Sequence, residues 1–139
     1  MITFETEEGF KFTLKQKLLL KKWIKRVVEE QYGKKLGDLS YMFCSDAKIL
    51  EVNKQYLQHD YYTDIITFDY CEGEVVSGDM FISVETVGSN AEEYKETFER
   101  ELHRVIIHGV LHLCGLKDKS EADAKKMRAA EERALSILE

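Results

Sequence analysis

The spacing of apolar residues predicts four strands separated by helices. Residues 2–6 alternate between apolar and polar side chains, as in a strand with one buried face. Residues 10–13 are expected to extend this strand or to pair with it. Runs rich in β-branched or aromatic residues predict the other strands over 39–44, 65–68 and 80–84. The expected sheet is small and mostly four-stranded.

Apolar residues recur three and four positions apart between these strands, which is typical of helices with one buried face. Thr13 and Gln16 have the spacing of a capping box, and Gly33 supplies a stop for the helix that follows. A long later helix is expected to begin at Asn90 and to end near Gly115. The remaining helices are expected to begin after Ser45 and Ser120.

Residues 1–139 are therefore expected to form a single α+β domain, with the sheet packed against about four to five helices. The length allows a substantial core, and contents of 44% hydrophobic and 33% charged residues are typical of globular proteins. There is no apolar run of about 18 residues, so we expect no membrane span and a cytoplasmic location. Three scattered cysteines without CxxC spacing fit reduced thiols in that compartment.

Charge is unevenly distributed along the chain. The net charge is −6, yet residues 1–35 carry 9 Lys and Arg against 5 Asp and Glu. Many of these lysines belong to the helix expected over residues 14–32. This helix is a candidate surface for RNA or ribosome contact, although a solvated lysine-rich face explains the pattern equally well.

Two histidines in the segment HGVLHLCGLKD, residues 108–118, have the spacing of metal ligands. His108 and His112 are four positions apart and project from the same face of the expected helix. Gly115 can end that helix and let the chain turn back, which brings Asp118 within reach as a third ligand. Three such protein ligands leave a position for water on zinc. The pattern predicts a catalytic zinc or other divalent metal centre on a zincin-like helix, with two satisfied core histidines as the alternative.

The same segment resembles the metzincin metalloprotease pattern with aspartate in place of the third histidine. That pattern requires a glutamate after the first histidine as general base, and position 109 here is glycine. A peptidase is therefore disfavoured, whereas hydrolysis of another substrate at a metal centre is not.

Three blocks of the sequence resemble the YbeY family of bacterial single-domain endoribonucleases. The blocks are NKQYLQHDYYTDIITF (53–68), SGDMFISVE (77–85) and ELHRVIIHGVLHLCGLKD (101–118), in the family's order and spacing. The resemblance implies a bound Zn²⁺ with His108, His112 and Asp118 as ligands. It also implies single-strand-preferring cleavage of RNA in 3′-end maturation of small-subunit (16S) ribosomal RNA and in ribosome quality control. Ribosomal RNA and the small ribosomal subunit are then the expected partners.

Two positions depart from the family pattern. Asp118 replaces a histidine, which keeps a ligand atom but adds negative charge, so we expect metal binding to persist and reactivity to shift. Leu57 stands where the family has an arginine, and its side chain cannot contact phosphate. Arg104, one turn before His108, is a candidate replacement that either contacts phosphate or orients a ligand through Glu101. An ordinary ion pair between Arg104 and Glu101 explains the same spacing.

Further candidates come from the first block. Asp64 is a candidate for a place beside the metal and the attacking water, and a turn shared with Thr63 is the alternative. Tyr56, Tyr61 and Tyr62 are candidates for stacking on bases, or for packing. Two other functions stay open, namely a non-catalytic ribosome-assembly or rRNA-binding factor with a structural metal, and a zincin-like metallopeptidase. The sequence leaves the oligomeric state open between a monomer and a weak dimer.

Overall fold

In this computed structural model, which describes residues 1–57 and 63–139, helices surround a four-stranded sheet. The strands are β1 (Ile2–Thr6), β2 (Lys35–Cys44), β3 (Ile65–Asp69) and β4 (Val75–Ser83). The α-helices are α1 (Lys17–Arg26), α2 (Asp46–Val52), α3 (Val84–Tyr94), α4 (Phe98–Leu113) and α5 (Glu121–Leu138). Turns of π-helix over Val27–Gln31 and Asn53–Leu57 continue α1 and α2. The predicted α+β fold is confirmed, and no helix in the described ranges has the length and apolar character needed to cross a bilayer.

The sheet is mixed, with strand order β1-β2-β4-β3. β1 and β4 both run parallel to β2, and β3 runs antiparallel to β4 at one edge. β3 begins directly after Asp64, whose carbonyl accepts the backbone N–H of Ser83 at 2.9 Å. This bond holds the backbone of Asp64 against the end of β4, from which α3 departs.

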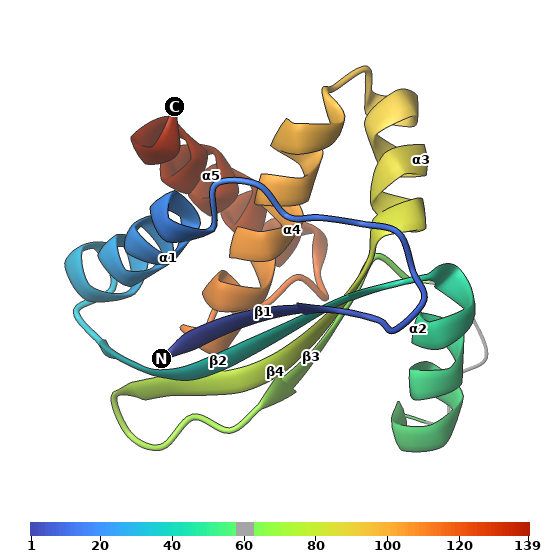
Figure 1. The fold of residues 1–139 in the computed structure, drawn as a ribbon. Coiled ribbons are helices and arrows are strands. Elements are labelled where there is room, and N and C mark those ends of the chain that lie inside the picture. Colours follow the sequence, from blue (N-terminus) through green and yellow to red (C-terminus); the bar gives the residue numbers. More distant parts are fainter. Residues whose placement is uncertain (58–62) are drawn as a thin grey trace.

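Helices α1, α4 and α5 cover one face of the sheet (Figure 1). Tyr41 on β2 points into this layer, and its hydroxyl donates to the Ile106 carbonyl of α4 at 3.0 Å. Trp23 on α1 donates its indole N–H to the Ala134 carbonyl of α5 at 2.8 Å. Both aromatic side chains thus bury their rings and satisfy their polar atoms. α2 packs on the opposite face through a smaller apolar cluster that includes Ile49.

The single long helix expected over residues 90–115 is two helices, so that prediction is wrong. α3 already begins after Ser83, which caps it, and Lys95 takes a left-handed conformation (φ +57°) that ends it. The side chain of Thr97 then accepts the backbone N–H of Arg100 at 3.1 Å and caps α4. The break turns the chain, so that α3 and α4 form two walls of one cavity.

The start of α1 also differs from the prediction. Gln16 adopts a left-handed conformation (φ 60°), and no side chain of the described residues caps the helix, so Thr13 does not form a capping box. Residues 10–13 form no strand, because the segment runs back over the helical layer to reach α1 (Figure 1). The predicted stop is confirmed, since Gly33 has φ +62° and donates its N–H to the Glu29 carbonyl at 3.1 Å.

Candidate active site

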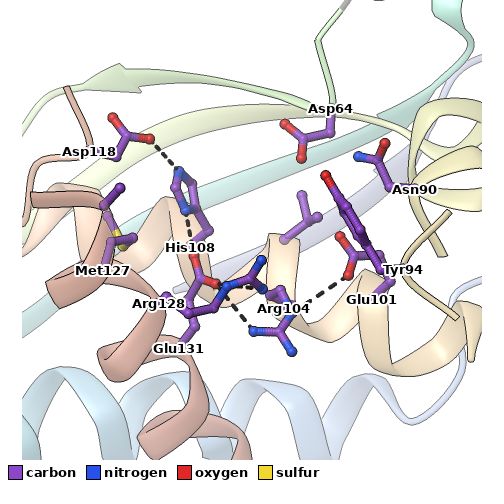
Figure 2. A pocket seen from close by; sticks show the side chains of 12 residues that line it. Asp64, Asn90, Tyr94, Glu101, Arg104, His108, Asp118, Met127, Arg128 and Glu131 are labelled. Carbon is purple, nitrogen blue, oxygen red and sulfur yellow. Dashed lines mark hydrogen bonds and ion pairs between the residues drawn. The ribbon is translucent and has the colours of Figure 1, made fainter. Parts of the chain in front are cut away.

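A polar cavity of about 320 Å³ lies where α3, α4 and α5 meet the start of β3 (Figure 2). This volume is typical of small-ligand sites. The polar side chains that line it come from distant parts of the sequence: Asp64, Asn90, Tyr94, Glu101, Arg104, His108, Asp118, Arg128 and Glu131. The cavity therefore brings together four of the five predicted site residues, whereas His112 does not line it.

His108 is held between two carboxylates. Its Nδ1 lies 2.8 Å from Oε2 of Glu131, and its Nε2 lies 3.3 Å from Oδ2 of Asp118. Because a carboxylate only accepts, Nδ1 donates to Glu131, and this fixes the orientation of the ring with Nε2 toward Asp118. Burial by itself lowers the pKa of His108, but the hydrogen bond and charge of Glu131, with the charges of Asp64 and Asp118, raise it above its usual value.

The distance between Nε2 of His108 and Oδ2 of Asp118 matches that between two ligand atoms of one zinc ion. Tetrahedral zinc with bonds of about 2.0–2.1 Å places neighbouring ligand atoms about 3.3 Å apart. With the imidazole neutral, Nε2 and the carboxylate are both acceptors, so a proton or a cation must lie between them. His112 is exposed one turn further along α4. Within the described ranges no group of three or more His, Cys, Asp or Glu side chains is arranged to hold a metal, so two of the three predicted ligands are brought together.

Arg104 is buried and engaged by three carboxylates. Its guanidinium nitrogens lie 2.8 Å from Glu132, 3.4 Å from Glu131 and 3.5 Å from Glu101. Only 7% of the side chain is exposed, so the guanidinium is not placed to meet a phosphate from solvent. Because Arg104 holds Glu131 and Glu131 holds His108, the geometry favours the orienting role over the phosphate-binding role. Arg104 orients His108 through Glu131, however, and not through Glu101 alone.

Asp64 projects into the cavity from the residue before β3 (Figure 2). Burial raises the pKa of its carboxyl, and the charge of His108 offsets this only in part. The neighbouring hydroxyl of Thr63 donates to the Ile65 carbonyl at 3.4 Å, which is a local turn contact. The two alternatives predicted for Asp64, a turn with Thr63 and a position in the cavity, therefore occur together. Its carboxyl lies beside His108 and has a raised affinity for a proton.

Gly109 allows α4 to lie close to the sheet beside His108. A Cβ at this position would lie 2.5 Å from Sδ of Met80 and 3.0 Å from Cδ1 of Ile65. A glutamate therefore cannot occupy this position without displacing the core. The close packing of α4 on the sheet at Gly109 thus disfavours a metzincin-type general base at this position.

Several residues that line the cavity are not among those predicted from the sequence. Glu131 on α5 is 6% exposed and lies four positions after the buried Met127. A carboxylate at a position where the helical spacing predicts a buried apolar residue is the signal that could have identified it. Arg128 has a side chain that is 55% exposed and lies 3.8 Å from Glu131, which makes it an accessible cation at the cavity. Asn90 and Tyr94 were missed because the boundaries of α3 were misplaced.

The residues of the first sequence block are only partly described. Tyr61 and Tyr62 lie outside the described residues. Tyr56 packs edge-to-face against Phe68, with ring centroids 5.9 Å apart, and does not line the cavity. Leu57 ends the π-helical turn after α2. Stacking of bases on Tyr61 and Tyr62 thus stays a prediction.

This chain is similar to known proteins over nearly its whole length. The family model for endoribonuclease YbeY matches residues 2–139. Proteins named endoribonuclease YbeY are 58% identical over 138 residues in Phocaeicola vulgatus (99% of each chain) and 55% identical over 136 residues in Bacteroides thetaiotaomicron (98% of each). The solution structure of TM1509 from Thermotoga maritima matches with a TM-score of 0.66 and 30% identity, covering 99% of this chain and 91% of that one. The chain therefore belongs to the endoribonuclease YbeY family.

Proposed function

We propose that this protein is a zinc-dependent, single-strand-preferring endoribonuclease that acts in 3′-end maturation of small-subunit ribosomal RNA and in ribosome quality control. The main support is the position of His108 between Glu131 and Asp118 in a polar cavity. Membership of the endoribonuclease YbeY family supports RNA as the substrate. Ribosomal RNA and the small ribosomal subunit are the proposed partners, in the cytoplasm, where three free thiols stay reduced.

His108, His112 and Asp118 are the proposed zinc ligands. When bound, zinc would act as a Lewis acid toward the phosphate and lower the pKa of water. Glu131 holds the imidazole of His108 so that Nε2 faces Asp118. Asp64, which lines the cavity and whose pKa burial raises, is the group proposed to take a proton from the attacking water.

Arg128 is the proposed contact to an RNA phosphate, because it is accessible whereas Arg104 is enclosed by carboxylates. We expect Arg128→Ala to weaken RNA binding several-fold and to reduce the slope of log affinity against log salt by about one. Arg133→Ala is the control, since Arg133 is exposed on the same helix outside the cavity. Equal slopes for both variants would instead assign the phosphate contacts to other cations, such as the lysines of α1.

The proposed activity is tested on an end-labelled fragment carrying the 3′ region of small-subunit ribosomal RNA. Wild type and His112→Ala are purified side by side, because contaminating ribonucleases are the main source of false cleavage. We expect wild type to cleave, a chelator to stop cleavage, and added zinc to restore it. His112→Ala should lose both bound zinc and cleavage. Cleavage that survives chelation, or equal cleavage by both proteins, would contradict the metal centre.

A non-catalytic ribosome-assembly factor is the second candidate. It is favoured by Leu57 at the position of the family's arginine, and by the lack of a three-ligand group within residues 1–57 and 63–139. Such a factor would still bind ribosomal particles after metal removal and would leave the fragment uncut. A metallopeptidase receives no support, because position 109 is a glycine and cannot act as the general base of the metzincin pattern.

A further inference from the structure

Two side chains of α3, Asn90 and Tyr94, border the cavity. Val87 and Ala91 form the buried face of this helix, and Asn90 and Tyr94 project beside them into the cavity. Tyr94 is 53% exposed. Within the part of the chain that is described, neither side chain makes a hydrogen bond or a ring contact. Because its ring borders a polar cavity, Tyr94 offers a face on which a planar ligand can stack.

We propose that Tyr94 and Asn90 form a nucleobase subsite, in which a base of the RNA strand stacks on the Tyr94 ring and the Asn90 amide hydrogen-bonds its edge. The subsite presupposes the proposed function, in which the strand is cut beside His108. Figure 2 shows the Tyr94 ring extending into the cavity toward Asp64, with Asn90 beside it. Proteins recognise unpaired RNA bases by this combination of stacking and edge contacts.

The charges around Tyr94 favour a neutral base over a phosphate. Asp64 and Glu101 lie at this end of the cavity (Figure 2), and one carboxylate oxygen of Glu101 has no hydrogen-bond partner among the described residues. Arg104 compensates Glu101 in part, through Nε at 3.5 Å, but Glu131 and Glu132 take up its other nitrogens, so it is not free to bind a phosphate. A base brings no negative charge to this position, and its amino group can donate to an acceptor.

The size of the stacked ring predicts which base binds more tightly. An asparagine amide offers one donor and one acceptor, which complement N7 and the N6 amino group of adenine. Uracil also presents a donor and an acceptor side by side, at N3 and O4, but its smaller ring offers less surface for stacking on Tyr94. We therefore expect the subsite to prefer adenine over uracil.

NMR titration with adenosine and uridine 5′-monophosphates locates the subsite independently of cleavage. We expect the adenine nucleotide to shift the signals of the Asn90 side-chain amide and the Tyr94 ring, and the uracil nucleotide to shift them less. Tyr94→Ala should remove the shift at Asn90, and Tyr94→Phe, which keeps the ring, should retain it. Tyr70→Ala is the matched control, since Tyr70 is 57% exposed but does not line the cavity. Shifts confined to other surfaces would overturn the subsite.

Cleavage kinetics on a short single-stranded RNA give the size of the effect. Because one stacked base contributes about tenfold in affinity, Tyr94→Ala should raise KM about tenfold with normal zinc content, and Tyr94→Phe should restore it. Asn90→Ala should raise KM for substrates with either base at this position, because both bases lose an edge contact. A normal KM for Tyr94→Ala would overturn the subsite alone. Normal cleavage by His108→Ala would overturn the proposed function instead.

Discussion

Alanine in place of His108 is expected to reduce RNA cleavage by about 100-fold or more while the protein stays folded. His108 links Glu131 to Asp118, and its removal takes away the proposed zinc ligand Nε2, which faces Asp118. The fold should persist, because Glu131 keeps its ion pairs with Arg104 and Arg128. Single-turnover cleavage of the ribosomal RNA fragment, bound zinc and Tm, all measured on one preparation, check this result.

His103→Ala is the control for the loss of a histidine from the same helix. The His103 ring lies edge-on to Trp23, with centroids 6.1 Å apart, and does not line the cavity. We expect this variant to have a lower Tm, because a buried ring is lost, and to cleave RNA at the normal rate below that Tm. The proposed role of His108 would be contradicted if His108→Ala cleaved as fast as His103→Ala.

Many elements of the fold could be predicted because their signals are local. Ser45 and Ser120 cap α2 and α5 as expected, with side chains that accept the backbone N–H three residues later. Leu20, Trp23 and Ile24 form the buried face of α1, as the apolar spacing predicts, but Leu19, at the edge of that face, is 46% exposed. The strand order β1-β2-β4-β3 has no such local signal, since it depends on pairing between distant segments.

The break between α3 and α4 could not be predicted, because the residues that form it are ordinary ones. Lys95 takes a left-handed conformation that non-glycine residues rarely adopt, and Thr97 resembles many threonines that cap nothing. The apolar spacing continues across both positions. Packing of α3 against α4 and the sheet therefore decides where the first helix ends.

The site could be predicted only where short-range geometry forms it. His108 and Asp118 meet because the chain turns at Gly115, which has φ +110°. Glu131 reaches His108 from another helix, and apolar periodicity does not specify how α5 lies on α4. Spacing likewise placed Arg104 on the side of His108 but did not reveal its partners on α5, Glu131 among them.

Methionine in place of Arg104 is expected to lower the free energy of unfolding by about 3 kcal/mol or more, which is roughly 10 °C in Tm. Methionine retains much of the side-chain length but removes the charge. Glu101 and Glu131 have side chains that are 4% and 8% exposed, and both would lose their buried cation. A buried charge without a partner is costly, because neither water nor protein solvates it. Cleavage should fall as well, since Glu131 orients His108.

Arg100→Met is the matched control, one turn earlier on the same helix. Arg100 also pairs with glutamates, including Glu132, but the carboxylates it contacts are 33–50% exposed. Surface pairs of this kind contribute little, so we expect a loss below about 1 kcal/mol. If chemical denaturation at about pH 7 gave equal losses of unfolding free energy for the two variants, burial of the Arg104 ion pairs would not determine how much they contribute to stability.

The dependence on pH separates an unpaired charge from a simple packing defect. Burial already raises the pKa of Glu101 above its usual value of 4.5, and removal of the Arg104 charge should raise it further. A carboxyl with a raised pKa in the folded state binds protons more readily when folded, so the loss in Arg104→Met should shrink as the pH falls from about 7 toward about 5. A packing defect would cost the same at both values. A loss that stays constant or grows on acidification would therefore contradict the assignment of Arg104 as the counterion of these buried carboxylates.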